Sequence, residues 1–149
     1  MGGFITKWAV RQDHAVTGDD LDGDGTVGDG VLERWVAAAC SAYLEGCPVL
    51  QGKRERDGLE LRQHTRNLPR GSALGRPESV VVTARATEFR PGSFVVAVRL
   101  RPLGGERDLA LDVWCEVQLE DPATGEPREL DSAVRDELIS IEHAARHYN

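Results

Sequence analysis

An acidic, glycine-rich stretch over residues 20–30, DLDGDGTVGDG, holds the residues best suited to chemistry and leads directly into a helical pattern. Asp20, Asp22 and Asp24 alternate with other residues, and Asp29 follows where the helical pattern begins. A carboxylate can act as a nucleophile or as a general base for water. We considered three interpretations of this stretch, which are a calcium site, a helix cap and an acyl-hydrolase loop.

The calcium interpretation rests on the alternating aspartates. Asp20, Asp22 and Asp24 fit positions 1, 3 and 5 of an EF-hand loop, with Gly25 at position 6. Position 12 is Val31, where that motif needs a bidentate carboxylate to complete the oxygen shell. The preceding segment is also predicted as a strand, not as an entering helix. The pattern is therefore incomplete for calcium.

The capping interpretation needs no chemistry. Asp29 is suited to be the N-cap of the following helix, because its carboxylate can accept a backbone N–H of the first turn. Carboxylates near the positive end of a helix are each stabilising by a few tenths to about 1 kcal/mol. A solvated loop that caps a helix would thus explain the acidity.

The hydrolase interpretation uses the same helix start differently. A helix N-terminus offers unpaired N–H groups and a partial positive charge, which can hold a substrate carbonyl as an oxyanion site. Asp22 lies seven residues before Asp29 across a glycine-rich bend, so one loop could supply both a carboxylate and the oxyanion donors. Removing one such donor typically costs about 3–4 kcal/mol of transition-state stabilisation.

Two periodicities define the elements around this loop. A three- and four-residue apolar repeat from Val31 to Leu44 predicts a long helix that ends at Gly46 and Pro48. Residues 51–58 are polar and are predicted to be a loop, and Asp131-Ser132 begins a terminal helix. Alternating and β-branched segments predict strands over Lys7–Val16, Leu59–Thr65, Ser79–Phe89, Ser93–Leu103 and residues 109–120, after which residues 121–127 end the sheet.

This order predicts an α+β fold in which one long helix lies against an antiparallel sheet. The length of 149 residues suits a single domain over residues 1–149. An open sheet edge is often covered by a second copy of the same chain, so we expect a homodimer.

Composition excludes several function classes. The net charge of -7 argues against nucleic-acid binding, which needs a surplus of cations. No apolar run approaches the roughly 18 residues of a membrane span, and the N-terminus lacks a signal-peptide core. The three cysteines, Cys40, Cys47 and Cys115, show no metal-ligand spacing and are predicted to be buried thiols of a cytoplasmic protein.

The run Asp20-x-Asp22-x-x-Gly25-x-Val27, followed by Leu32-x-x-Trp35 and an alanine-rich helix, resembles the start of hotdog-fold acyl-CoA thioesterases of the 4-hydroxybenzoyl-CoA type. The segment VQLEDPATGEP over residues 117–127 is similar to the last strand and the following turn of that family. The hairpins around residues 90–93 and 104–107 also resemble it. The resemblance covers roughly residues 8–138.

The resemblance implies a curved antiparallel sheet around one helix, and a homodimer or homotetramer with sites between subunits. It places the catalytic aspartate on Asp22 and the carbonyl-polarising N–H on or next to Asp29. This chain has Thr26-Val27-Gly28-Asp29 where relatives usually carry His-Val-Asn-Asn. The resemblance further implies substrate contacts at Gly25, Thr26, Gly28, Arg90 and Ser93.

These observations together predict an acyl thioesterase. The substrate would be an acyl-CoA or an acyl-carrier protein, with coenzyme A as part of the substrate and with no separate cofactor or metal. The alternatives are a non-catalytic acyl-thioester-binding dimer of the same fold and the calcium loop. Because many functions share one fold, the role of Asp22 gives the prediction its content.

Overall fold

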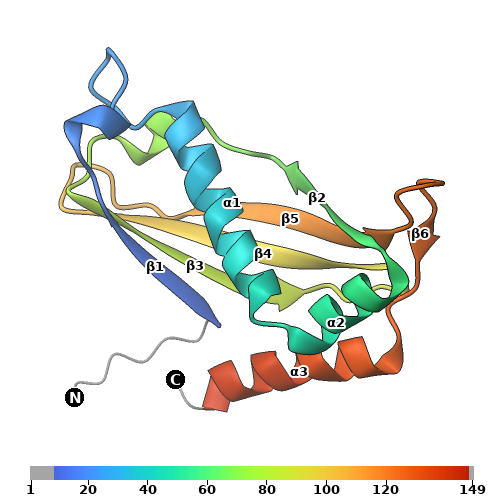
Figure 1. Cartoon of the computed structure of the whole chain (residues 1–149). Coiled ribbons are helices and arrows are strands. Elements are labelled where there is room, and N and C mark those ends of the chain that lie inside the picture. The colour runs from blue at the N-terminus through green and yellow to red at the C-terminus, as the bar shows by residue number, and fades with distance from the viewer. Residues whose placement is uncertain (1–8, 148–149) are drawn as a thin grey trace.

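The computed structural model describes residues 9–147, so Lys7, at the start of the first predicted strand, lies outside the described residues. Six strands form one antiparallel sheet in the order β1-β3-β4-β5-β2, with β6 added beside β5. Helix α1 lies across one face of this sheet (Figure 1). The elements are β1 Val10–Ala15, the 3-10 turn η1 Gly18–Asp20, α1 Asp29–Glu45, α2 Pro48–Asp57, β2 Glu60–Arg66, the 3-10 turn η2 Gly71–Leu74, β3 Ser79–Thr87, β4 Ser93–Leu103, β5 Leu111–Glu120, β6 Pro127–Arg128 and α3 Ser132–His147.

The core lies between α1 and the sheet. The apolar stripe predicted for the helix is buried, and it consists of Val31, Leu32, Trp35, Val36, Ala39, Cys40, Tyr43 and Leu44. Alternate residues of β3, β4 and β5 point toward this stripe, as their period-two burial shows. Burying one large aliphatic side chain is worth about 1.5–3 kcal/mol, so this interface accounts for most of the stability. The predicted α+β class is confirmed.

The prediction of a loop over residues 51–58 was wrong. Residues 48–57 form helix α2, with Pro48 in the first turn and Gly58 in the left-handed conformation at its end (φ 63°). The first amides of α2 are bonded by a carboxylate from α3, because Val49 N–H and Leu50 N–H donate to Glu137 at 2.7 and 3.0 Å. The helix is therefore completed by a residue that is distant in sequence.

The end of the sheet was also predicted too early. Residues 127–128 form β6, which pairs with residues 119–120 of β5. Helix α3 follows and packs near α2 and one end of β3 (Figure 1). Its Glu142 is only 7% exposed, and one oxygen of this carboxylate accepts the Tyr43 hydroxyl at 2.6 Å and the Ala86 N–H at 2.9 Å. This carboxylate ties α3 to both α1 and the sheet.

All three cysteines are free thiols inside the core, as predicted. Burial raises the pKa of Cys47 to about 12, so its thiol stays protonated at neutral pH. In the described part of the chain, no helix is both long enough and apolar enough to cross a bilayer.

Candidate active site

The acidic loop doubles back on itself before it enters α1. Leu21 and Val27 form an isolated antiparallel bridge, and Asp22 N–H donates to the Thr26 carbonyl at 2.8 Å. Gly28 N–H reaches the Asp20 carbonyl at 3.0 Å. These bonds hold the segment from Asp20 to Gly28 as a compact loop, and they bring Asp22 next to the first residues of the helix.

Two of the three alternating carboxylates serve the loop itself. Asp20 accepts the N–H and the hydroxyl of Thr17 at 2.9 and 3.2 Å. Asp24 accepts the hydroxyl and the N–H of Thr26 at 2.7 and 3.0 Å, and these bonds lower the pKa of Asp24 below its ordinary value. Within the described residues, the Asp22 carboxylate accepts no hydrogen bond and forms no ion pair. Asp22 is therefore the one member of the triplet whose carboxylate is free to act on a ligand.

The fit to a calcium site stays incomplete in three dimensions. Among the described residues, no group of three or more His, Cys, Asp or Glu side chains is arranged so that it could hold a metal ion. Asp20 and Asp24 are instead oriented by threonines, as in a loop that is ordered by its own hydrogen bonds.

The Asp22 carboxylate lies against Gly28. One of its oxygens is 2.7 Å from the position that a Cβ atom on Gly28 would occupy. Any other residue at position 28 would therefore displace this carboxylate. Gly28 is also the N-cap of α1, so the carboxylate and the start of the helix are in direct contact.

The capping interpretation placed the N-cap at Asp29, whereas the structure has it at Gly28. The helix begins at Asp29, and Gly28 is the N-cap and offers no side chain to bond the first-turn amides. Leu32 N–H is the first to bond within the helix, to the Gly28 carbonyl at 3.1 Å. The N–H groups of Asp29, Gly30 and Val31 therefore have no partner inside the helix. Space is open beside Gly30, since no heavy atom lies within 4 Å of its hypothetical Cβ.

The Asp29 side chain fastens the helix start to η2. Its carboxylate accepts the Gly71 N–H at 2.7 Å and lies 3.4 Å from the Arg70 guanidinium. Gly71 approaches α1 so closely that a Cβ there would come within 2.5 Å of the Gly28 carbonyl oxygen. The side chain of Asp29 thus joins the start of α1 to η2.

Arg90 and Ser93 lie at the other end of the sheet. Arg90 N–H closes the β3–β4 turn by bonding the Ser93 carbonyl at 2.8 Å. The acidic loop joins the opposite end of β3, where Val16 N–H donates to Glu78, and a nine-residue strand spans roughly 25–30 Å. The Arg90 guanidinium is ion-paired with Glu116 at 2.7 Å and Glu88 at 3.3 Å. One copy of the chain therefore does not bring Arg90 and Ser93 to Asp22.

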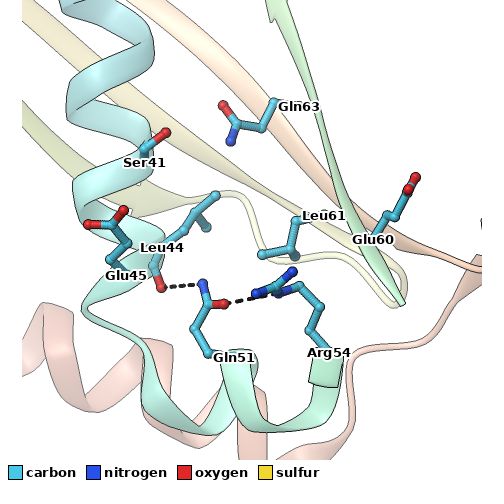
Figure 2. Close-up of a pocket in the computed structure, with 8 residues that line it drawn as sticks. All are labelled: Ser41, Leu44, Glu45, Gln51, Arg54, Glu60, Leu61 and Gln63. Atoms are coloured by element: carbon cyan, nitrogen blue, oxygen red, sulfur yellow. Dashed lines mark hydrogen bonds between the residues drawn. The ribbon is translucent and has the colours of Figure 1, made fainter. Parts of the chain in front are cut away.

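Two hollows flank these elements. A cleft of about 600 Å³ borders the acidic loop and is formed by residues 24–26, 75–76 and 104–107. A second pocket of about 360 Å³ lies between the C-terminal half of α1, helix α2 and strand β2 (Figure 2). Ser41, Leu44 and Gln63 line this pocket, and Figure 2 shows Gln51 bonding the Leu44 carbonyl and Arg54 bonding Gln51, both at 3.0 Å.

Sequence reasoning missed Gly71, Arg107 and the cleft. Gly71 lies outside the helices and strands that the sequence predicts, and no local pattern indicates that it touches the start of α1. Arg107 follows a turn far along the chain. Its proximity to the acidic loop depends on how β4 and β5 are aligned in the sheet.

Neither a protein-family model nor a curated protein matches the sequence. Solved structures do match the fold. A Thermus thermophilus thioesterase in complex with coenzyme A and zinc is 19% identical, covers 92% of this chain and 96% of that chain, and has a TM-score of 0.65. A hypothetical protein from Staphylococcus aureus in complex with CoA is 12% identical over 96% and 89% of the two chains, with a TM-score of 0.68.

A 1,4-dihydroxy-2-naphthoyl-CoA thioesterase from Synechocystis also has a similar structure. It is 13% identical over 89% of this chain and 97% of that chain, with a TM-score of 0.63. The expected fold is thereby confirmed. The chain has the hotdog fold that these thioesterases have, with a curved antiparallel sheet around the long helix α1.

Proposed function

We propose that this protein hydrolyses an acyl thioester, with Asp22 acting at a carbonyl that the first amides of α1 polarise. The observation that carries the proposal is the contact between the Asp22 carboxylate and Gly28, the N-cap of the helix. The Asp22 carboxylate thus lies beside the N-cap of a helix whose first N–H groups have no partner inside the helix. The hotdog fold of named thioesterases supports the choice of a thioester as substrate.

The reaction follows from that arrangement. The thioester carbonyl oxygen accepts hydrogen bonds from the N–H groups of Asp29 and Gly30, which stabilise the negative charge of the tetrahedral intermediate. Asp22 either attacks the carbonyl carbon or takes a proton from the attacking water. In the general-base route, the water oxygen bonds to the carbonyl carbon, the C–S bond breaks, and the proton that Asp22 took from water passes to the leaving thiolate. In the nucleophilic route, the C–S bond breaks as an anhydride forms with Asp22, and a water molecule then hydrolyses the anhydride, which releases the acid and restores Asp22. The products are a carboxylate and the thiol of coenzyme A or of a carrier-protein pantetheine arm.

A panel of acyl-CoA and acyl-carrier-protein thioesters tests the activity, with released thiol as the readout. Turnover of at least one class, above the rate without protein, is the expected result. Binding of the thioesters without any release of thiol would instead indicate a non-catalytic acyl-thioester-binding protein.

Gly28→Ala is expected to lower kcat by about tenfold or more with little change in stability. The added methyl group would occupy the position 2.7 Å from the Asp22 oxygen and would push the carboxylate away from the helix start. A displacement of about 1 Å can cost on the order of 100-fold in rate. Steady-state kinetics and thermal melting of both proteins provide the measurement.

Gly18→Ala is the matched control for that variant. It adds the same methyl group in η1, outside the proposed site, where no heavy atom lies within 4 Å. Unchanged kcat in Gly28→Ala would contradict the position assigned to Asp22.

We also propose that the protein is a homodimer joined through β2. This strand is one edge of the sheet, and six of its seven residues are exposed. Antiparallel pairing of two β2 strands about Gln63 places Glu60 opposite Arg66 of the second copy, so opposite charges meet twice. Such pairing satisfies the unpaired backbone groups of the edge.

This pairing also supports a site between subunits. β2 runs from α2 toward η2, which is bonded to the start of α1 through Gly71 and Asp29. In this antiparallel pairing, the β2 strand of the second copy runs in the opposite direction. The acidic loop of the second copy therefore comes toward the pocket of Figure 2 in the first copy, and toward the end of the first sheet that holds Arg90 and Ser93. We therefore keep both residues as proposed substrate contacts, contributed across the interface.

Exchanging the charges on β2 tests the pairing. Glu60→Arg and Arg66→Glu are each expected to weaken self-association several-fold, because each puts like charges opposite one another. The double variant restores the complementarity and should recover most of the affinity. Sedimentation velocity over a concentration series measures the association and also distinguishes a dimer from a tetramer. A monomeric wild-type protein, or a double variant weaker than both single variants, would contradict this interface.

A further inference from the structure

The cleft beside the acidic loop is lined mainly by glycines and arginines. We call it the glycine-lined cleft and define it by residues 24–26, 75–76 and 104–107. It measures about 600 Å³, and its walls include Gly25, Gly75, Gly104 and Gly105. Side chains from other positions lie on two of these glycines, because Arg107 covers Gly75 and the Glu78 carboxylate covers Gly104.

Two arginines, Arg76 and Arg107, line this cleft, and both are exposed. Within the described part of the chain, neither Arg76 nor Arg107 forms an ion pair or a side-chain hydrogen bond. Arg90 at the opposite end of the sheet, by contrast, is paired with two carboxylates. A guanidinium offers five donors that match the geometry of phosphate and carboxylate groups. The positive charges in the cleft are therefore available to an anion.

Both arginines are seated over glycines that bring them toward the acidic loop. The Arg76 guanidinium lies 3.9 Å from the Cβ position of Gly25, three residues after Asp22. The Arg107 stem crosses Gly75, which has φ 69°, and its Cγ is 2.7 Å from the Cβ position of that glycine. A side chain at Gly75 would expel Arg107 from this place.

Three carboxylates lie in or beside the cleft. The Glu78 carboxylate has one oxygen 2.6 Å from the position that a Cβ atom on Gly104 would occupy, and it forms no ion pair with the described residues. Asp24 is directed back into its own loop by the two hydrogen bonds from Thr26. Glu106 lies exposed in the turn between β4 and β5 and forms no ion pair with the described residues. Among the described residues, none of these three carboxylates forms an ion pair with Arg76 or Arg107.

We propose that the glycine-lined cleft binds a phosphate group of the arm that carries the acyl thioester, with Arg76 and Arg107 as its ligands. This inference rests on the proposed hydrolase function. In a thioester held at Asp22, the acyl group and the thiol arm leave the carbonyl in opposite directions. The cleft borders the Asp22 loop through residues 24–26, so an arm that leaves the carbonyl on this side reaches Arg76 and Arg107. The phosphate belongs either to the pantetheine attachment or to the nucleotide of coenzyme A.

Binding to the Asp22→Asn variant tests the inference without turnover. Calorimetry with coenzyme A, dephospho-coenzyme A, 4′-phosphopantetheine and pantetheine should show pantetheine as the weakest ligand. Replacing both Arg76 and Arg107 by alanine is expected to weaken coenzyme A binding by about tenfold to 100-fold, as expected when charge-assisted hydrogen bonds are lost, and to leave pantetheine unchanged. Lysine at both positions should recover part of the affinity.

Arg101→Ala is the matched control. Arg101 lies on β4 close to the same end of the sheet and is exposed, but it does not line the cleft. Its loss removes one positive charge from the same region and should change coenzyme A binding less than twofold. Melting curves of all variants establish that each is folded.

The ligand series assigns the phosphate. If dephospho-coenzyme A and 4′-phosphopantetheine retain the arginine-dependent affinity, the phosphate is the one nearest the pantetheine. If both bind like pantetheine, it is the nucleotide 3′-phosphate. Equal binding of coenzyme A and pantetheine, or an arginine double variant that binds coenzyme A normally, would overturn the inference. Absence of turnover with arginine-dependent binding would refute the hydrolase and retain the cleft.

Discussion

Replacing Asp22 by asparagine is expected to lower kcat for thioester hydrolysis by about 100- to 10,000-fold, the range for loss of a general base. The asparagine keeps the size of the side chain beside Gly28, so the loop and the start of α1 should stay in place. Asparagine can neither accept the proton of water at neutral pH nor form an anhydride with the acyl group. Released thiol under saturating substrate measures the loss.

Asp19→Asn is the appropriate control for this variant. Asp19 lies in η1, three residues before Asp22, and is exposed. The substitution Asp19→Asn removes the same charge as Asp22→Asn. Its rate should stay within about twofold of wild type, because the Asp19 side chain makes no contact with Asp22 or the start of α1 among the described residues. An Asp22→Asn protein that melts normally and keeps more than a tenth of the activity would rule out the catalytic role of Asp22.

Replacing Glu142 by alanine is expected to destabilise the protein by about 3–5 kcal/mol, since two hydrogen bonds to one buried carboxylate are lost. The Tyr43 hydroxyl and the Ala86 N–H both donate to Glu142 and would remain buried without an acceptor. Burial and the Glu142 carboxylate raise the pKa of Tyr43, so this hydroxyl stays a donor at all working pH values. Urea unfolding gives the free energy of unfolding.

Asp136→Ala controls for the change of helix composition, because Asp136 lies exposed on the same helix. It should alter stability by less than about 0.5 kcal/mol, as surface substitutions usually do. Glu142→Gln keeps an acceptor for both donors and should lose much less than alanine. If alanine and glutamine at position 142 are equally stable, Glu142 does not tie α3 to the core.

The sequence predicted the elements whose side chains repeat with a clear period. Helix α1 and strands β3, β4 and β5 have one buried face each, so their apolar spacing reports their geometry directly. Helix α2 has a single buried residue, Leu50, and its first amides are bonded by Glu137 from α3. No pattern within residues 48–57 could indicate that contact.

The candidate site was predictable to a similar degree. The acidic spacing and the family resemblance identified Asp22, and the loop geometry agrees with its predicted proximity to the helix start. Asp29 was misassigned as N-cap because the local rule favours aspartate over glycine, whereas a side chain at position 28 would collide with Asp22. The pairing of Asp29 with Gly71 and the arginines of the cleft depend on tertiary contacts.

A crystal structure of the Asp22→Asn variant with an intact CoA thioester tests the central claim most directly. The account predicts that the carbonyl oxygen lies about 2.7–3.1 Å from the N–H groups at the start of α1. The side chain at position 22 should lie about 3–3.5 Å from the carbonyl carbon, or reach it through one water. A thioester carbonyl bound away from both groups, with position 22 facing solvent, would contradict it.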